Sequence, residues 1–276
     1  MLMGVYPYDT LGQGVNNVHV WAVANQKGGV GKTTSTVSLA GLLREQGHRV
    51  LMVDLDPHGS LTSYFKYDPD DIDFSTFDLF MHEGKVPEGL PKKIIKSTTK
   101  EGIDLFPAST ALATLERRVA GQGGMGLVIS KSLATLWDDY EYVIIDTPPI
   151  LGVLMINALA AAQRLLIPVQ TEFLAVKGLE RMTHTLGMVM QSTKKQLPFT
   201  IIPTLYDRRT HASVNALKKI RELYGEQVYK ESIPVDTKFR DASELGKIPS
   251  DVDSDGRGVR VYRHLLTSLM NQPDAA

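Results

Sequence analysis

Residues 20–34 read VWAVANQKGGVGKTT, and this stretch decides the fold. The apolar run 20–24 is typical of a buried strand. A glycine-rich turn at 28–31 ends that run, and Lys32 then opens a long segment with an amphipathic pattern. The stretch therefore predicts a strand, a loop and a helix in that order.

The predicted loop has the shape of an anion site. Glycines let successive backbone N–H groups point inward, and the helix that follows adds its positive N-terminal end. The expected ligand is a nucleotide phosphate, with Lys32 on the β- and γ-phosphates and the Thr33 hydroxyl on Mg²⁺, as in a P-loop. The residues expected to hold the phosphates are Gly28, Gly29, Val30, Gly31, Lys32, Thr33 and Thr34.

The loop departs from the general pattern G-x-x-x-x-G-K-[ST] at one position. That pattern requires a glycine where this chain has Gln26, and the next residue is a second lysine, Lys27. A glycine turn with a purely structural role is the alternative interpretation, but KGGVGKT is much rarer by chance than a lone glycine motif.

KGGVGKTT, together with VDLDP at 53–57 and VIIDTPP at 143–149, resembles the deviant-Walker ATPases of the ParA/MinD superfamily, most of all its small ParA/Soj branch. The resemblance covers nearly the whole chain. It implies a homodimer that encloses two ATP molecules, in which Lys27 crosses the interface to touch the partner's nucleotide. An ordinary solvated loop lysine is the alternative for Lys27. The catalytic residues that the resemblance implies are Lys27, Lys32 and Asp56.

Acidic residues stand at the ends of two predicted strands. Asp54 and Asp56 end the apolar strand 49–55, at the edge where open α/β sheets bind ligands. The resemblance implies that Asp56 orients the attacking water and that Asp54 supports the Mg²⁺ shell. Asp146, after strand 142–145, is the expected Walker B carboxylate, which holds Mg²⁺ through a water. A strand-end Asp-Pro turn is the alternative for the first pair.

His58 follows the acidic segment, where the resembled family has glutamine. A histidine at this place can sense pH or contact a partner. A neutral, exposed side chain is the alternative.

Strands and helices alternate along the chain. This order predicts an α/β fold, a single-domain, doubly wound and mostly parallel sheet of the P-loop NTPase class. Residues 1–17 have no period and are expected to form a flexible tail ahead of an ATPase domain at 18–276. The other elements expected are strands 103–106, 165–169 and 199–205, and helices 112–119, 151–162, 173–196 and 259–270.

Composition sets outer bounds on the function. The 276 residues, 43% of them hydrophobic, can bury one sizeable core. The absence of cysteine excludes a disulfide framework and the cluster of an iron–sulfur ATPase of the nitrogenase-reductase kind, and it favours a cytoplasmic protein. No apolar run reaches the roughly 18 residues of a membrane span. We expect neither export nor stable membrane insertion.

Basic residues gather in one part of the chain. Residues 177–240 hold twelve Lys or Arg against six Asp or Glu, although the net charge of the chain is −1. The resemblance places nonspecific DNA binding in these C-terminal segments, and such binding weakens steeply with salt. A solvated charge is the alternative for any single residue. The candidates are Arg208, Arg209, Lys218, Lys219, Arg221, Lys238 and Arg240.

The resemblance also places the adenine beside the end of strand 199–205 and the segment IPVD at 233–236. The candidates for base contacts are Tyr206, Asp207, Pro234 and Asp236.

Three further stretches bear on the cargo: 56–65, 151–182 and 203–210. They resemble ParA-like proteins of the ParC type, which position chemotaxis arrays at the cell pole. This resemblance implies a slow ATPase stimulated by a ParB-like or ParP-like protein, located at the nucleoid or the pole. Partition of a chromosome or plasmid with a ParB-like partner stays open, because no physical feature of the residues distinguishes the cargoes.

Two other classes are disfavoured. A MinD-like membrane switch needs a basic amphipathic tail, and the chain has only NQPDAA after Met270. A bacterial tyrosine kinase would need a terminal tyrosine cluster, where this chain has Tyr262 alone.

Overall fold

The computed structural model describes residues 18–118, 124–193 and 195–275. A seven-stranded sheet runs through them in the order β3-β4-β2-β5-β1-β6-β7, and every neighbouring pair except β3 and β4 is parallel. The expected doubly wound, mostly parallel sheet is confirmed. The strands are β1 (His19–Val23), β2 (Val50–Asp54), β3 (Lys96–Ser97), β4 (Ile103–Phe106), β5 (Tyr142–Asp146), β6 (Arg164–Gln170) and β7 (Phe199–Thr204).

Helices connect the strands. The expected helix at 112–119 is a 3₁₀ turn, Thr110–Thr114, followed by a single α-helical turn, and the helix expected from Phe173 begins two residues later. The helices are α1 (Lys32–Glu45), α2 (Ser60–Tyr64), α3 (Thr76–Leu79), α4 (Leu90–Ile94), α5 (Leu115–Arg118), α6 (Val128–Ala134), α7 (Val153–Ala161), α8 (Ala175–Thr193), α9 (His211–Tyr224), α10 (Lys238–Leu245), α11 (Pro249–Val252) and α12 (Arg257–Met270).

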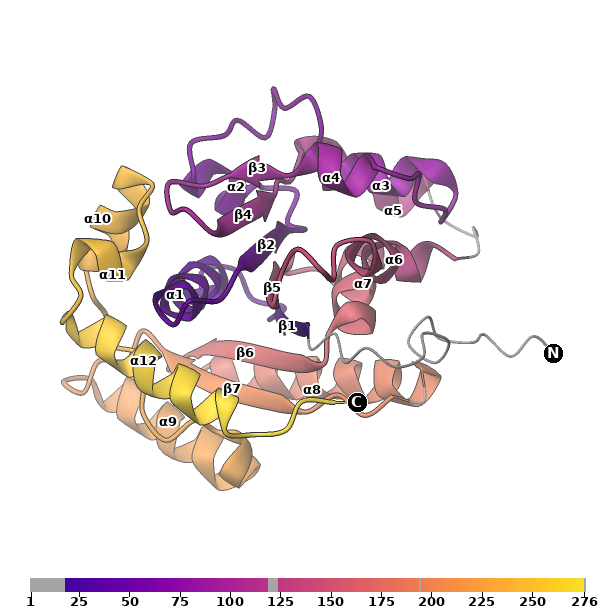
Figure 1. Cartoon of the computed structure of the whole chain (residues 1–276). Coiled ribbons are helices and arrows are strands. Elements are labelled where there is room, and N and C mark those ends of the chain that lie inside the picture. The colour runs from indigo at the N-terminus through magenta and orange to yellow at the C-terminus, as the bar shows by residue number, and fades with distance from the viewer. Residues whose placement is uncertain (1–17, 119–123, 194, 276) are drawn as a thin grey trace.

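The sheet separates two apolar clusters. Side chains alternate between its faces, so Val20 and Ala22 of β1 pack into one cluster while Trp21 and Val23 pack into the other. Residues of α6, α7 and α8 complete the first cluster, and residues of α1 and α12 complete the second. Figure 1 shows α1 and α12 on one side of the sheet and α6 and α7 on the other.

The strand order brings three strand ends together. β1 lies between β5 and β6, and the register pairs Val23 with Asp146 across β1 and β5, and Asp54 with Asp146 across β2 and β5. Because the strands are parallel, the segments that follow β1, β2 and β5 leave the sheet at the same edge. The predicted loop and the predicted carboxylates therefore meet there.

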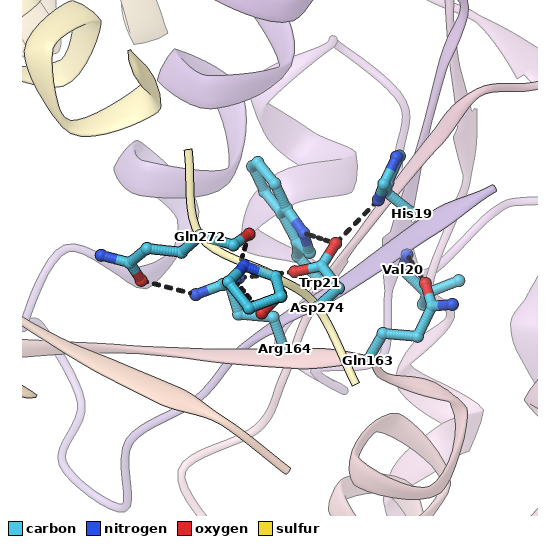
Figure 2. Close-up of polar contacts among 8 residues, drawn as sticks. His19, Val20, Trp21, Gln163, Arg164, Gln272 and Asp274 are labelled. Atoms are coloured by element: carbon cyan, nitrogen blue, oxygen red, sulfur yellow. Dashed lines mark hydrogen bonds and ion pairs between the residues drawn. The ribbon is translucent and has the colours of Figure 1, made fainter. Parts of the chain in front are cut away.

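At the other end of the strands, the segment after α12 contacts β1 and β6 (Figure 2). The guanidinium of Arg164, at the start of β6, donates to Asp274 Oδ1 at 2.6 Å and to Gln272 Oε1 at 2.9 Å. Asp274 Oδ2 accepts from Trp21 Nε1 at 3.2 Å and contacts His19 Nδ1 at 2.7 Å. We call these residues the Arg164 clasp. It ties the end of the described chain to the amino ends of β1 and β6.

Within the described ranges, no helix combines the length and the apolar character needed to cross a bilayer. The predicted tail at 1–17 lies outside the described residues.

Candidate functional site

The loop between β1 and α1 has the backbone that its glycines predict. The φ angles are +71° at Gly29 and +90° at Gly31, a region where other side chains are strained. Gly31 is the N-cap of α1, its carbonyl accepts from the Ser35 N–H at 2.9 Å, and no side chain caps the helix start. The first amides of α1 are therefore left for an anionic ligand.

Hydrogen bonds to two strands, β6 and β7, hold this loop in place. Asn25 Nδ2 donates to the Pro168 carbonyl in β6 at 2.7 Å, while Asn25 Oδ1 accepts from the Lys27 N–H at 3.0 Å. On the other side, the Thr204 hydroxyl at the end of β7 donates to the Val30 carbonyl at 2.8 Å. The loop is thus built as a rigid cradle rather than a free connection.

Two adjoining cavities open at this edge of the sheet. The loop cavity has a volume of about 480 Å³ and the side cavity about 170 Å³. They share Gly31, Thr34 and Leu205. The loop cavity is lined by Gly28, Gly29, Gly31, Lys32, Thr33, Thr34, Asp56, His58, Ser60, Pro149 and Leu205. The side cavity is lined by Gly31, Thr34, Thr204, Leu205, Ile233, Pro234, Val235, Asp236, Thr237, Phe239, Arg240 and Tyr262.

The Lys32 side chain is nearly buried in the wall of the loop cavity, with its Nζ 3.3 Å from the Lys27 carbonyl. Burial lowers its pKa, and the carboxylates of Asp146 and Asp56 oppose that shift. A cation held in a partly desolvated cavity interacts strongly with an anionic ligand. Its position fits the expected role on a phosphate.

Thr33 and Asp146 face each other at the carboxyl end of β5. The Thr33 hydroxyl donates to Asp146 Oδ2 at 2.6 Å, whereas the buried Asp146 Oδ1 has no hydrogen-bond partner in the described part of the chain. Burial raises the pKa of Asp146 to about 7. An unsatisfied buried carboxylate oxygen beside a hydroxyl suits a divalent cation, which would restore the charged form.

Asp54 is buried beside this pair and is already satisfied. Its Oδ2 accepts from the Thr62 amide at 2.8 Å and hydroxyl at 2.7 Å, and its Oδ1 accepts from the Asp56 amide at 3.0 Å. Burial and the nearby Asp146 raise the pKa of Asp54 to about 8. Its expected place in a Mg²⁺ shell stays a prediction, and it fixes the turn that carries Asp56.

No cluster of three or more acidic, histidine or cysteine side chains that could hold a metal occurs among the described residues. A cation beside Thr33 and Asp146 would therefore complete its shell with water and ligand oxygens. Mg²⁺ commonly binds in this way, through one or two protein groups together with substrate phosphates.

Lys27 is not among the residues that line the loop cavity. Its Nζ donates to Gln170 Oε1 at 3.0 Å and forms an ion pair with Glu172. Its predicted contact with the partner's nucleotide stays a prediction.

The four candidates for base contacts lie in two different places. Pro234 and Asp236 line the side cavity, whose other walls include apolar side chains. Tyr206 lines a separate cavity. The Asp207 carboxylate accepts hydrogen bonds from the Arg209 guanidinium, whose Nη2 lies 2.7 Å from Oδ2. The base contacts of all four stay predictions, and Pro234 and Asp236 line the cavity that adjoins the loop cavity.

The side cavity also contains residues that the sequence analysis missed. Leu205, with a φ of +51°, stands at the junction of the two cavities, and Phe239 and Tyr262 come from α10 and α12. The Tyr262 hydroxyl is 2.8 Å from Ser35 Oγ in α1. The position of Leu205 at the end of a predicted strand could have identified it, but no pattern connects the two aromatic residues to the loop.

All seven DNA candidates are exposed. Four have contacts in the chain: Arg209 with Asp207, Lys218 with Glu222 at 3.8 Å, Arg221 with the Lys230 carbonyl at 2.6 Å, and Lys238 with Asp241 at 3.0 Å. Arg240 lines the side cavity. Exposed pairs of this kind are weak and leave the cations available to a polyanion.

A family model described as an AAA domain matches residues 18–199. The chain is 35% identical to the sporulation initiation inhibitor protein Soj of Bacillus subtilis, over 90% of this chain and 96% of that protein. It is 31% identical to the chromosome partitioning protein ParA of Myxococcus xanthus, over 91% of this chain and 87% of the relative.

Among solved structures, the fold is similar to cobyrinic acid a,c-diamide synthase from Mycobacterium smegmatis with a bound ATP analog and magnesium. That chain is 36% identical, with a TM-score of 0.78 and coverage of 92% of this chain and 94% of the other.

Proposed function

The chain belongs to the ParA/MinD superfamily of ATPases, and on that premise we propose that it is an ATP-switched homodimer that binds DNA and positions a cellular cargo. ATP and Mg²⁺ are its cofactors, as the similar structure with an ATP analog and magnesium supports. The observation that carries the proposal is the pair of adjoining cavities. One lies at the phosphate loop, and the other has apolar side chains in its walls and the size of a ring.

The residues around the loop cavity have different roles in phosphoryl transfer. Lys32 and the first amides of α1 bind the phosphates, Thr33 and Asp146 hold Mg²⁺, and Asp56 orients the attacking water. Bound Mg²⁺ neutralises charge that develops on the phosphate oxygens. Hydrolysis is slow in this proposal, because the nucleotide site of a single chain is incomplete until a partner binds.

A second copy of the chain is the partner that completes the nucleotide site. Apolar side chains are exposed in the loops after β5 and β6, at the edge that holds the loop cavity: Ile150 is 69% exposed, Phe173 84% and Leu174 59%. Such a concentration on a surface is typical of an interaction site. Lys27 lies beside the last two, since it pairs with Glu172, and would cross to the partner's nucleotide.

The ATP-bound dimer would present two copies of the basic segments to DNA. A ParB-like or ParP-like protein would stimulate hydrolysis and so release the DNA. The cargo is a polar chemotaxis array in the first form of this proposal, on the resemblance of three stretches of the sequence. Partition of a chromosome or plasmid is the second form, favoured by the likeness to a chromosome partitioning protein.

Retention on nonspecific duplex DNA with ATP or ADP tests the switch. We expect retention with ATP that falls steeply between 50 and 200 mM salt and is absent with ADP. Equal retention with both nucleotides would contradict a switch. For the cargo, a fluorescent fusion expressed with and without the chemotaxis genes should lose its polar position only in the second strain, whereas partition predicts no difference.

A further inference from the structure

The Asp56 carboxylate is held by one neighbour on one side. Its Oδ1 accepts two hydrogen bonds, both from His58: from the backbone N–H at 3.0 Å and from the ring Nδ1 at 2.8 Å. Its Oδ2 has no hydrogen-bond partner among the described residues. The Asp56 side chain is 13% exposed, while that of His58 is 77% exposed. Both residues line the loop cavity.

The backbone around this pair is fixed independently of the histidine ring. The Asp56 N–H donates to Asp54 Oδ1, and its carbonyl accepts from the Gly59 N–H at 2.8 Å. Gly59 has a φ of +60°, and a Cβ there would lie 2.6 Å from Pro69 Cβ, so the turn has little room to change. The remaining freedom of Asp56 is the rotation of its carboxylate, and the ring limits that rotation.

The contact also defines the state of the ring. A carboxylate oxygen accepts a hydrogen bond, so Nδ1 must carry the proton, and in the neutral ring Nε2 is then an acceptor. The polar or charged side chains that line the loop cavity with the pair include Lys32 and Ser60. Within the described part of the chain, neither forms a hydrogen bond with the ring, so the link to Asp56 defines its orientation.

We propose that His58 is a positioning residue for hydrolysis: its Nδ1–H holds Asp56 Oδ1 and thereby leaves Oδ2 to orient the attacking water. The inference rests on the proposed role of Asp56 and deepens it. It also assigns a role to the histidine that replaces the glutamine of the resembled family at this position. The ring is too exposed for its contact to matter much to folding, so its loss should affect the hydrolysis step alone.

The test compares His58→Ala with His58→Asn. The Asn amide nitrogen is bonded to Cγ, as Nδ1 is, so the asparagine can restore the donor without the ring. His264→Ala is the matched control, because His264 makes a similar contact with a carboxylate, 3.0 Å from Glu231, on an exposed part of α12. The measurements are the single-turnover rate of ATP hydrolysis, the affinity for ATP and the melting temperature.

We expect His58→Ala to lower the hydrolysis rate about three- to tenfold, the effect of losing one orienting hydrogen bond. Affinity for ATP and the melting temperature should not change. His58→Asn should recover most of the rate, and His264→Ala should equal the wild type. In an Asp56→Ala background, His58→Ala should have no further effect.

The outcomes separate this inference from the function beneath it. A wild-type rate for His58→Ala, alongside a slow Asp56→Ala, would overturn the role of His58 and leave the proposed function intact. A further loss on adding His58→Ala to Asp56→Ala would show that the ring acts without the carboxylate, which also overturns it. A wild-type rate for Asp56→Ala would overturn both.

Discussion

The ammonium group of Lys27 is paired with the carboxylate of Glu172 in its own chain, and Gln170 accepts a further hydrogen bond from it. Both members of the pair are about one-third exposed, at 39% and 35%. In the proposed dimer Lys27 must leave these partners to reach the nucleotide of the other chain. The contact therefore opposes dimer formation by a small amount.

Glu172→Gln should ease that step. An exposed ion pair contributes about 0.2–1 kcal/mol and the dimer releases two, so the concentration of ATP-bound protein at half dimerisation should fall about two- to thirtyfold. Sedimentation of the Asp56→Ala protein with ATP, with and without the second change, measures it. Glu141→Gln is the control, because Glu141 lies 3.5 Å from Arg49 in a surface pair outside the loop cavity. Weaker dimerisation of Glu172→Gln would show that the glutamate supports the dimer instead.

Lys32→Ala should abolish measurable ATP binding. The change removes the buried cation of the loop cavity and leaves only backbone dipoles and Mg²⁺ to oppose the phosphate charges within the chain. Calorimetric titration with ATP and Mg²⁺ checks this, with Lys100→Ala, a lysine paired with Asp251, as the control. Unchanged affinity in Lys32→Ala would remove the assignment of the loop.

Arg209 should bind DNA in competition with Asp207. Hydrogen bonds from Arg209 lower the pKa of Asp207 to about 2, so this carboxylate is charged at neutral pH and holds the guanidinium. Asp207→Asn should therefore strengthen retention on DNA, and Arg209→Ala with Lys238→Ala should weaken it and reduce the salt slope by about two. The double change of Arg209 and Lys238 should leave the affinity for ATP unaltered. Retention that ignores both changes would place the DNA surface elsewhere.

The Arg164 clasp should stabilise the fold at neutral pH. Arg164→Met removes one partner of a nearly buried pair and should lower the free energy of unfolding by about 2–4 kcal/mol. Lys92→Met, which breaks an exposed pair with Asp139, should cost less than about 1 kcal/mol. Urea titrations measure both. Equal small losses would mean that the clasp contributes nothing beyond a surface pair.

The clasp should also make stability depend on pH. Burial raises the pKa of Asp274, but hydrogen bonds from His19, Arg164 and Trp21 outweigh it and leave the pKa below the ordinary value of 3.8. A group with a depressed folded pKa stabilises the protein above its unfolded pKa and loses that effect as the pH falls through its folded pKa. The difference between wild type and Asp274→Asn should therefore be full at pH 7 and shrink below about pH 4.

The residues that the sequence placed well share one property: each stands at the carboxyl end of a predicted parallel strand. Lys32 and Asp56 lie in the segments that follow β1 and β2, Asp146 is the last residue of β5, and any doubly wound sheet with this order brings them to one edge. The apolar runs predicted where these residues lie, whereas their roles were expected from the loop motif and from the resemblance to the ParA/MinD superfamily.

Contacts between distant segments were not readable from the sequence. Tyr262 lines the side cavity from α12, and Arg164 pairs with Asp274, which lies 110 positions later in the chain. Each contact is made by single side chains, which leave no pattern in the sequence. β3 is only two residues long and pairs antiparallel at the edge of the sheet, which gives no periodicity to detect. The charge count placed Arg209 on the surface, but it could not show that Asp207 holds it.

In the proposed switch, ATP joins two chains through the loop cavity. Light scattering of Asp56→Ala with ATP and Mg²⁺ tests it most directly, because slow hydrolysis lets the ATP-bound state accumulate. We predict a doubling of the mass with ATP, no change with ADP, and no doubling when Lys27→Ala is added. A protein that binds ATP yet keeps the mass of one chain would contradict the account.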